Sequence, residues 1–525
     1  MGLFQKYFVD VRHGTKITYS ESDLRKLDRN YEREVLPQET KRVRSPLRKM
    51  PQKAYLTQIR DYAFERILDN HMYTFQHILV VPNPYDLVKQ SALLLFNSSK
   101  ETKIRYRVLG DTPDVDFMGE TGYTTRHRVP VVGLYLKRSN KVELEMLDLE
   151  GNVVKRRMLR IYVSDKPKRL EGIKMEKIGK KLPYFPYIMI NSVSGHPFAV
   201  DPNGDIRYSI QLWTTTAGMI PLANGHFLYE DREANRMGKN GRIISCQYHE
   251  MDYLGRVYRT FLMDYPVVRA VAQNGKSLYL VASLYANEKK RQLLELDLES
   301  GRVKEISKVP RLPKDTPFGY IDLKSKRKAF GKAVESADGK VTLSCNDLKE
   351  KAKQDGGITA DIRKGMRTEL VETERETGEV LGKWYLNRPV TKVWLFEPDI
   401  LSFCKPVEVT PEVVFGEVAP PAEFGGNLPK MAEEPLGRAY FGNVFLCGEL
   451  LIGYILPGCV SRIYLAGKKH SYVQDYQGMK TIYKRKFPLA ISLKGLASDE
   501  YHVFVESQDV VHQLKHEIRV TDKER

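Results

Sequence analysis

Glycine turns recur along most of this chain at a spacing that few folds produce. One set closes a pattern of apolar strand, acidic residue, turn and second strand. It consists of Gly204, Gly255, Gly301 and Gly378, separated by 51, 46 and 77 residues. A second set of Asn-Gly or Asp-Gly turns lies at 224–225, 274–275 and 338–339. A small antiparallel sheet cannot bury both of its faces alone, whereas several such sheets packed radially can, so the repeat predicts a β-propeller over residues 191–525.

Short strands precede this repeat. Apolar and polar residues alternate over 104–108 and over 142–146, and the turn at 148–151 leads into a further strand. This pattern predicts a β-sandwich over residues 76–165. The fold class expected from the sequence is therefore mainly β, with an N-terminal β-sandwich followed by a β-propeller.

The sequence also predicts what lies before, between and at the end of these two units. Residues 1–75 predict a short helical, basic extension with two helices, at about 24–35 and at 55–68, because apolar residues in both stretches recur every three to four positions. Residues 166–190 are expected to form a basic junction between sandwich and propeller. A last hairpin over 501–520 is expected to seal the propeller ring.

The charge balance indicates what the protein could bind. The chain has 84 Lys and Arg residues against 66 Asp and Glu, a formal net charge of +18, and residues 155–181 hold 11 basic against 3 acidic residues. Such a surplus favours a small anionic or aromatic ligand, an anionic glycan or a protein partner. The segment also fits a basic edge strand followed by a solvated linker. Nucleic acid is not a predicted partner, because no fold signature with interleaved basic and aromatic residues is present.

Cysteines and apolar runs point to the compartment. The five cysteines are odd in number and no two lie within four residues of each other, which excludes a paired-cysteine zinc site and a dense disulfide framework. The first ten residues lack the apolar run of a signal peptide. The most apolar stretch, 444–460, is broken by Glu449 and Pro457 and is too short to span a bilayer. We therefore expect a cytoplasmic protein with reduced thiols, no transmembrane segment, no metal and no cofactor.

Three motifs follow one another in the predicted sandwich. They are Asn83-Pro84-Tyr85 with the apolar run 91–96, the strand 127–135, which reads His-Arg-Val-Pro-Val-Val-Gly-Leu-Tyr, and the strand 140–144, which reads Asn-Lys-Val-Glu-Leu. In order and spacing they resemble the N-terminal module of the bacterial aryl-sulfate sulfotransferases. The resemblance covers roughly residues 77–400, because the glycine repeat lies where that family carries a six-bladed propeller.

This resemblance implies transfer of a sulfo group from a phenolic sulfate to a phenolic acceptor, without an adenylyl-sulfate cofactor. In the family a channel histidine carries the sulfo group, and other histidines and an arginine stabilise the charge that develops. Where the family has His-His-Asp, this chain has Val-Val-Arg ending at Arg269, and no histidine occurs between His249 and His470. Two functions stay open: a divergent arylsulfotransferase, or a non-catalytic propeller that binds an anionic ligand, a glycan or a protein.

Four residues are candidates for ligand contact, and none is assigned a catalytic role. By the resemblance, Arg269 lies where an inner strand enters the channel, and an arginine there could hold a sulfate, phosphate or carboxylate group in a bidentate way. Trp213 could form an aromatic wall, and Lys328 could add positive charge beside a third inner strand. His226 follows the turn at 224–225. The alternatives are a salt bridge between blades for Arg269 and packing or surface roles for Trp213 and His226.

Overall fold

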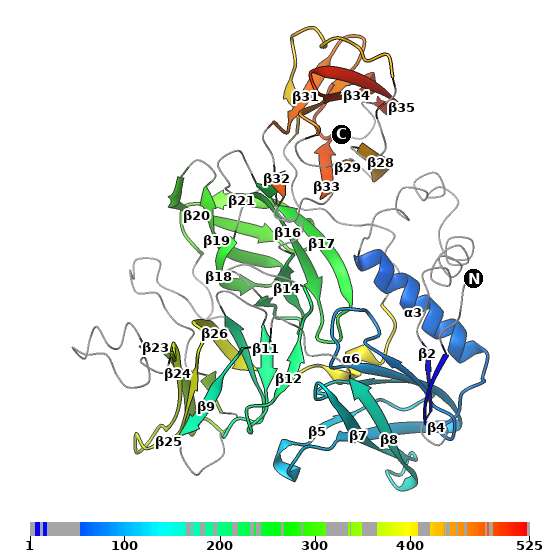
Figure 1. Cartoon of the computed structure of the whole chain (residues 1–525), viewed down its shortest axis with the longest axis vertical. Helices are drawn as coiled ribbons and strands as arrows, with labels where there is room; N and C mark the ends of the chain where they lie inside the picture. The colour runs from blue at the N-terminus through cyan, green and yellow to red at the C-terminus, as the bar shows by residue number, and fades with distance from the viewer. Residues whose placement is uncertain are drawn as a thin grey trace.

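The computed structural model describes residues 6–10, 14–17, 53–163, 170, 172–178, 184–192, 197–212, 219–231, 236–237, 243–263, 267–284, 287–310, 334–336, 338–348, 365–407, 420–434, 436, 441–447, 450–455, 459–477, 480–481 and 487–521. Over these residues the chain is mainly β, as predicted, and its strands form seven sheets (Figure 1). The short helices are η2 (Pro113–Val115) and α6 (Ile400–Phe403).

The N-terminal sandwich is organised around one long strand, β4 (Ala92–Val108), whose two halves pair with different strands. The first half pairs with β3 and β6, and the second half pairs with β5 and β7. These strands and their neighbours are β1 (Lys6–Asp10), β2 (Gly14–Ile17), β3 (Leu79–Pro82), β5 (Phe117–Glu120), β6 (Thr124–Val131), β7 (Arg138–Leu147) and β8 (Val153–Val163). The β4–β7 pairing and the β7–β8 hairpin confirm the predicted strands at 104–108 and 142–146.

The second of the two helices expected in the N-terminal extension is present, while the first, at about 24–35, lies outside the described residues, and the described part of the extension begins with strands. Helix α3 (Lys53–Asp69) confirms the helix predicted at 55–68. Its sequence contains neither Gly nor Pro, the residues that interrupt helices most strongly. Strands β1 and β2 pair with each other, and β2 runs parallel to β3, so the start of the extension adds an edge to the sandwich.

Four sheets follow the sandwich. Sheet 1 contains β10 (Ile188–Ser192), β11 (Phe198–Val200), β12 (Ile206–Ser209) and β26 (Val390–Leu395). Sheet 2 contains β13 (Met219–Pro221), β14 (Phe227–Glu230), β15 (Arg236–Met237), β16 (Ile243–Met251), β17 (Val257–Met263) and β32 (Lys480–Thr481). Sheet 3 contains β18 (Val267–Asn274), β19 (Ser277–Leu284), β20 (Asn287–Asp297) and β21 (Val303–Ile306). Sheet 4 contains β22 (Val334–Glu335), β23 (Val341–Asp347), β24 (Thr368–Glu374), β25 (Val380–Leu386) and β9 (Met175–Ile178).

The glycine repeat marks the turns of these four sheets. The first set of turns joins β11 to β12, β16 to β17, β20 to β21 and β24 to β25, and the second set joins β13 to β14, β18 to β19 and β22 to β23. All seven glycines have a positive φ, from 54° at Gly275 to 93° at Gly255. Glycine adopts this conformation without the steric cost that a Cβ atom brings, which explains why glycine recurs at these positions.

Successive sheets pack face to face. Sheets 4 and 1 share one buried apolar core, sheets 1 and 2 contribute to a second, and sheets 2 and 3 share a third. Two strand exchanges join sheets 4 and 1, the last and the first of these sheets along the chain, because β9 pairs with β25 in sheet 4 and β26 pairs with β10 in sheet 1. This arrangement is compatible with the predicted propeller, whose closure and six blades stay predictions.

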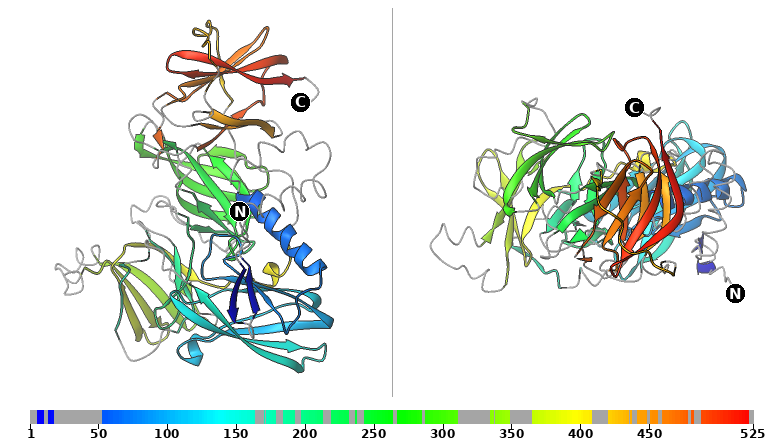
Figure 2. Two further views of the ribbon diagram at one scale, coloured as in Figure 1. Left: turned by 45° about the vertical axis from the view of Figure 1, so that its right-hand side comes forward. Right: turned by 90° about the horizontal axis from the view of Figure 1, so that it is seen from above.

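The last strands form a second β-sandwich within the range predicted as propeller. Its sheets have the orders β27-β31-β30-β34-β35 and β28-β29-β33. The strands are β27 (Ala422–Glu423), β28 (Phe441–Cys447), β29 (Leu450–Ile455), β30 (Arg462–Ala466), β31 (Ser471–Asp475), β33 (Phe487–Ser492), β34 (Asp499–Ser507) and β35 (Val510–Val520). Their shared core includes Ile463, Ile491 and Val503. Figures 1 and 2 show this unit at the end of the molecule away from the N-terminal sandwich.

The predicted role of the last hairpin is therefore wrong. The hairpin over 501–520 exists as β34–β35, but β34 pairs with β30 of the C-terminal sandwich. The strands exchanged between sheets 4 and 1 are β9 and β26. Part of the segment 166–190, expected to be a basic junction, thus becomes strand β9 of sheet 4.

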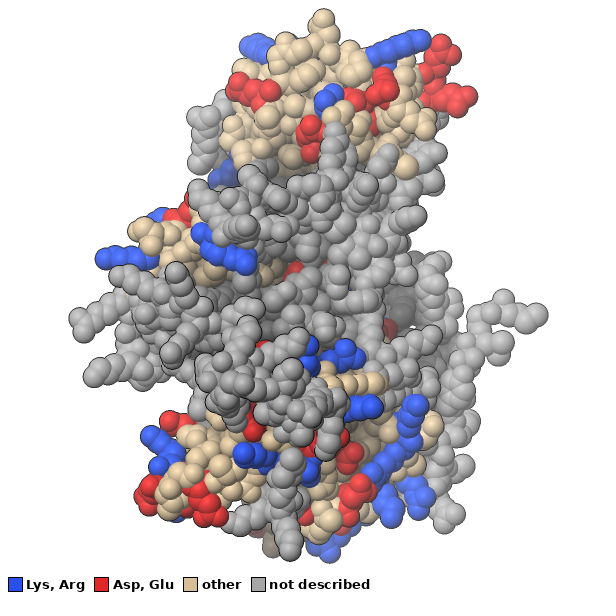
Figure 3. Space-filling view, turned by 60° about the vertical axis from the view of Figure 1, so that its left-hand side comes forward, with Lys and Arg blue, Asp and Glu red and all other residues tan. Residues whose placement is uncertain are grey.

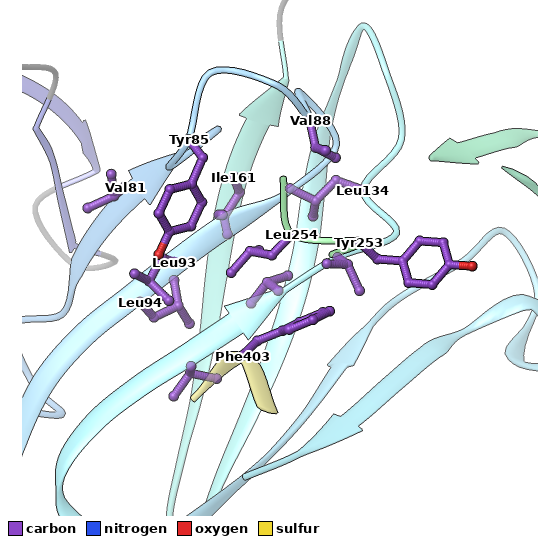
Figure 4. Packing of buried hydrophobic residues seen from close by; sticks show 14 of the residues in the cluster. Val81, Tyr85, Val88, Leu93, Leu94, Leu134, Ile161, Tyr253, Leu254 and Phe403 are labelled. Atoms are coloured by element: carbon purple, nitrogen blue, oxygen red, sulfur yellow. The ribbon is translucent and has the colours of Figure 1, made fainter. Parts of the chain in front are cut away.

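The N-terminal sandwich and the sheet array share a hydrophobic core. Tyr253 and Leu254, from the turn between β16 and β17, lie among sandwich residues such as Val88 and Leu134, as Figure 4 shows. The backbone N–H of Val257 donates a hydrogen bond to Thr57 Oγ1 of helix α3 at 3.0 Å. The helix, the sandwich and sheet 2 therefore pack as one body.

Charges on the surface are mixed. On the face drawn in Figure 3, described Lys and Arg side chains lie between Asp and Glu side chains on both the upper and the lower part of the molecule. Two like charges are neighbours on the sandwich, where Lys141 of β7 is directly opposite Arg160 of β8. No described helix has the length and apolar character that crossing a membrane requires.

His127, in the second family motif, gives the sandwich a pH dependence. Its side chain is 1 % exposed, its Nε2 lies 2.9 Å from Ser98 Oγ and 3.0 Å from Thr102 Oγ1, and its ring stacks on Phe96. Its Nδ1 is buried without a hydrogen-bond partner among the described residues. Burial lowers the pKa of His127 to about 4, because a charged imidazolium would be poorly solvated there.

We expect the protein to lose about 3 kcal/mol of unfolding free energy through His127 as the pH falls from 6.5 to 4. The sign follows because the unfolded state binds a proton in this window and the folded state does not. Urea titrations across this range should show a flatter dependence for His127→Gln than for the wild type. His470→Gln, at an exposed position, serves as the control. A His127→Gln profile as steep as that of the wild type would contradict the assignment.

Candidate active site

Of the four predicted contact residues, the structure fully describes His226. Arg269 lies on β18, the first strand of sheet 3, with its backbone opposite Val281. Its side chain is outside the described part of the chain, as are Trp213 and Lys328. The predicted place of Arg269 at the mouth of a channel and the contacts of these three residues stay predictions.

His226 forms a histidine–carboxylate pair in sheet 2. It follows the Asn224-Gly225 turn and precedes β14, and its Nδ1 lies 2.8 Å from Glu250 Oε1 of β16. The side chain of His226 is 19 % exposed and that of Glu250 is 7 % exposed. The carboxylate is therefore sheltered, while part of the imidazole reaches solvent.

Neighbouring side chains hold Glu250 in its charged form. Asn224 Nδ2 donates a hydrogen bond to Glu250 Oε1 at 3.1 Å, and Arg259 Nε lies 3.6 Å from Glu250 Oε2. Burial by itself would raise the pKa of Glu250, but the hydrogen bond from His226 and the charge of Arg259 lower it overall. An ionised carboxylate at this position favours a proton on His226 Nδ1.

Strand β17 of sheet 2 holds the imidazole ring of His226 in place. Tyr258 of β17 stacks on His226 with ring centroids 4.2 Å apart. Its hydroxyl donates to Asp252 Oδ2 at 2.9 Å, and the same oxygen accepts from Arg256 Nε at 2.6 Å. These buried contacts restrict rotation of the aromatic side chain, so the imidazole has a rigid neighbour.

His249, a second histidine of sheet 2, is buried and has structural partners. His249 is 1 % exposed, with its Nε2 3.1 Å from Asp231 Oδ2 and its Nδ1 3.0 Å from Thr260 Oγ1. Lys53 of helix α3 donates to the same Asp231 oxygen at 2.9 Å. Burial lowers the pKa of His249, so this group links helix α3 to sheet 2 as a neutral imidazole.

The geometry at His226 suits nucleophilic chemistry. In the tautomer that donates from Nδ1 to Glu250, the lone pair lies on Nε2, and Nε2 has no hydrogen-bond partner among the described residues. A neutral imidazole oriented by a carboxylate is a common arrangement for attack or proton transfer. Within the described ranges, no group of three or more His, Cys, Asp or Glu side chains could hold a metal ion.

Glu250 is the residue that sequence reasoning missed. It lies 24 positions from His226, and no local motif joins the two. The antiparallel register of β14 and β16, with Phe227 opposite Met251, brings them together. Only the strand pairing, which depends on tertiary structure, reveals the pair.

Comparison with known proteins supports the assignment of the sandwich. Residues 79–164 match the arylsulfotransferase Ig-like domain. This range begins at β3 and ends just after β8, and it includes all three motifs. The resemblance is confirmed over this domain, so the chain carries an arylsulfotransferase Ig-like domain. A search of curated proteins found no match.

Solved structures give distant likenesses. A protein of unknown function from Bacteroides caccae has 11 % identity and a TM-score of 0.17, covering 56 % of this chain and 98 % of its own. A cobalt-substituted ACO from Synechocystis, an apocarotenoid oxygenase, has 12 % identity and a TM-score of 0.15, covering 58 % of this chain and 65 % of its own. These TM-scores are too low to support any inference.

Proposed function

We propose that the protein is a divergent arylsulfotransferase in which His226 carries the sulfo group. The observation that supports this most is the pair formed by His226 Nδ1 and Glu250 Oε1 at 2.8 Å, in a chain that carries the arylsulfotransferase Ig-like domain. The substrate class follows from that family resemblance: a phenolic sulfate as donor and a second phenol as acceptor.

The proposed reaction has two steps. His226 Nε2 attacks the sulfur of the donor, the N–S bond forms, the S–O bond to the phenol breaks, and the phenolate leaves with the bonding electrons. The oxygen of the acceptor phenol then attacks the same sulfur, the N–S bond breaks, and the acceptor loses its proton to solvent. Throughout both steps Glu250 keeps the proton on Nδ1 and stabilises the positive charge that the ring gains.

The test measures phenol release from 4-nitrophenyl sulfate, with phenol as acceptor and without an adenylyl-sulfate cofactor. We expect steady turnover by the wild type and a loss of roughly 100-fold or more in His226→Asn, because a reacting side chain is removed. Glu250→Gln should lose roughly 10-fold, since it can still orient the ring but supplies no charge. His502→Gln, in the C-terminal sandwich, is the matched control.

Two outcomes would overturn the proposal. Full activity in His226→Asn would exclude this histidine as the sulfo carrier. An inactive, folded wild-type protein would exclude aryl-sulfate transfer and leave the alternative, a non-catalytic protein that binds an anionic ligand, a glycan or another protein.

A further inference from the structure

A cavity of about 320 Å³ lies where the N-terminal sandwich meets the sheet array. Its walls come from three separate segments: the loop between β6 and β7, the chain around the start of β9, and the turn that joins β11 to β12. A single water molecule needs about 30 Å³, and sites for small molecules begin near 300 Å³. The cavity is therefore large enough for a small organic molecule.

The body of the cavity is apolar. Six apolar side chains line it, namely Leu136, Ile173, Met175, Phe198, Val200 and Ile206. Phe198 and Val200 belong to the buried core shared by sheets 1 and 4, and the other four pack against that core while staying half-buried. Covering these four side chains with an apolar group would gain free energy through the hydrophobic effect.

Two walls of the cavity are held in place by contacts within the protein. Tyr135 lies between two guanidinium groups, with the Arg207 Cζ 3.8 Å and the Arg138 Cζ 4.0 Å from its ring centroid. In the turn opposite, the Asp201 carboxylate accepts the backbone N–H groups of Asn203 and Asp205 at 2.9 and 3.0 Å. Both walls are thus fixed before any ligand binds, which reduces the entropic cost of binding.

Gly204 lies in the third wall, where its backbone conformation favours glycine. Gly204 has φ +83°, and a Cβ atom there would lie 2.6 Å from Met175 Cε. A side chain at this position would push Met175 into the cavity or move the turn. The glycine of the repeat therefore preserves the space as well as the turn.

Two opposite charges lie among the lining residues. Lys137 and Asp205 are both exposed, and neither side chain has a hydrogen bond or ion pair within the described part of the chain. The other acids nearby are paired, Asp201 with Arg207 at 2.9 Å and Asp111 with Arg138 at 2.6 Å. Burial, together with Asp201 and Asp111, raises the pKa of Asp205, and a bound cation would relieve this repulsion.

We propose that this cavity binds a small zwitterion with an apolar body, the chemistry of a free apolar α-amino acid. The side chain of the ligand fills the apolar walls, its ammonium group pairs with Asp205, and its carboxylate pairs with Lys137. An aryl sulfate carries only negative charge and would meet the unpaired Asp205. The site is therefore distinct from the sulfo-transfer site proposed at His226.

Isothermal titration calorimetry on the full chain tests this inference with three probes that share a phenyl ring and a two-carbon chain. L-phenylalanine carries both charges, 2-phenylethylamine lacks the carboxylate, and 3-phenylpropanoate lacks the ammonium. Losing one charged contact of this kind costs about a factor of ten in affinity. We therefore expect L-phenylalanine to bind at least about tenfold more tightly than either single-charge probe.

Variants at the rim separate the two contacts. Asp205→Asn should weaken the binding of L-phenylalanine about tenfold and leave the binding of 3-phenylpropanoate unchanged. Lys137→Gln should weaken the binding of L-phenylalanine about tenfold and leave the binding of 2-phenylethylamine unchanged. Asp509→Asn, at an exposed position in the C-terminal sandwich, is the control. Leu136→Trp should abolish binding of all three probes by filling the cavity.

Several results would overturn the inference. They are no binding of L-phenylalanine at millimolar concentration, a preference for 3-phenylpropanoate, or equal affinities in Asp205→Asn, Lys137→Gln and the wild type. His226→Asn should bind L-phenylalanine normally, so failure of the sulfo-transfer proposal would leave this test unaffected.

Discussion

Replacing Arg128 with Met is expected to lower the free energy of unfolding by about 3–5 kcal/mol. Arg128 Nη2 lies 2.7 Å from Asp61 Oδ1 and Nη1 lies 2.8 Å from Glu65 Oε1, and the side chains of Arg128 and Asp61 are 2 % and 3 % exposed. Met fills similar space but leaves the Asp61 carboxylate buried without its cation. Urea titration followed by far-UV circular dichroism measures the change.

Arg126 offers a matched control on the same strand. It pairs with Glu65 at 2.7 Å and Asp69 at 2.6 Å, but its side chain is 36 % exposed. Because water screens these pairs, Arg126→Met should cost no more than about 1 kcal/mol. Equal losses in the two variants would show that burial of the Arg128–Asp61 pair does not determine how firmly helix α3 is held.

Replacing Arg207 with Met should produce a loss of similar size, about 3–5 kcal/mol, at the other contact between the sandwich and the sheet array. Arg207 and Asp201 are both 0 % exposed and lie 2.9 Å apart. Arg207 also donates to the backbone carbonyls of Gly133 and Val115 at 2.7 and 2.9 Å. The substitution removes both backbone contacts and leaves the Asp201 charge buried.

Arg138 is the control here, because it contacts the same Tyr135 ring. Its ion pair with Asp111 has side-chain exposures of 37 % and 55 %, so Arg138→Met should cost about 1 kcal/mol or less. The same urea titration compares the two variants. A loss in Arg138→Met as large as that in Arg207→Met would mean that ring stacking, rather than the buried ion pair, dominates this contact.

Residues of the family motifs in the sandwich contact other elements of the fold. Arg128, from the second motif, binds Asp61 of helix α3, and Tyr85, from the first motif, donates its hydroxyl to the same carboxylate. Tyr135 stacks against Arg207 of sheet 1. The sequence identified the motifs, but their partners lie 24 to 72 positions away, so local pattern could not predict the contacts.

The sequence by itself determined the local conformation of the chain. Glycine is favoured where φ is positive, and alternating apolar residues favour a half-buried strand, so the turns at Gly204, Gly225 and Gly255 and the strands between them were predictable from short segments. The same reasoning found helix α3 and the N-terminal sandwich.

Tertiary structure alone decided which of these elements meet. The exchange of β9 and β26 between sheets 4 and 1, the separate C-terminal sandwich, the pair of His226 with Glu250, and the cavity beside Asp205 all depend on strand register and on packing between distant segments. Such contacts are selected by the total burial and pairing of the folded chain. No short stretch of sequence contains that information, because each partner is specified only when the other is in place.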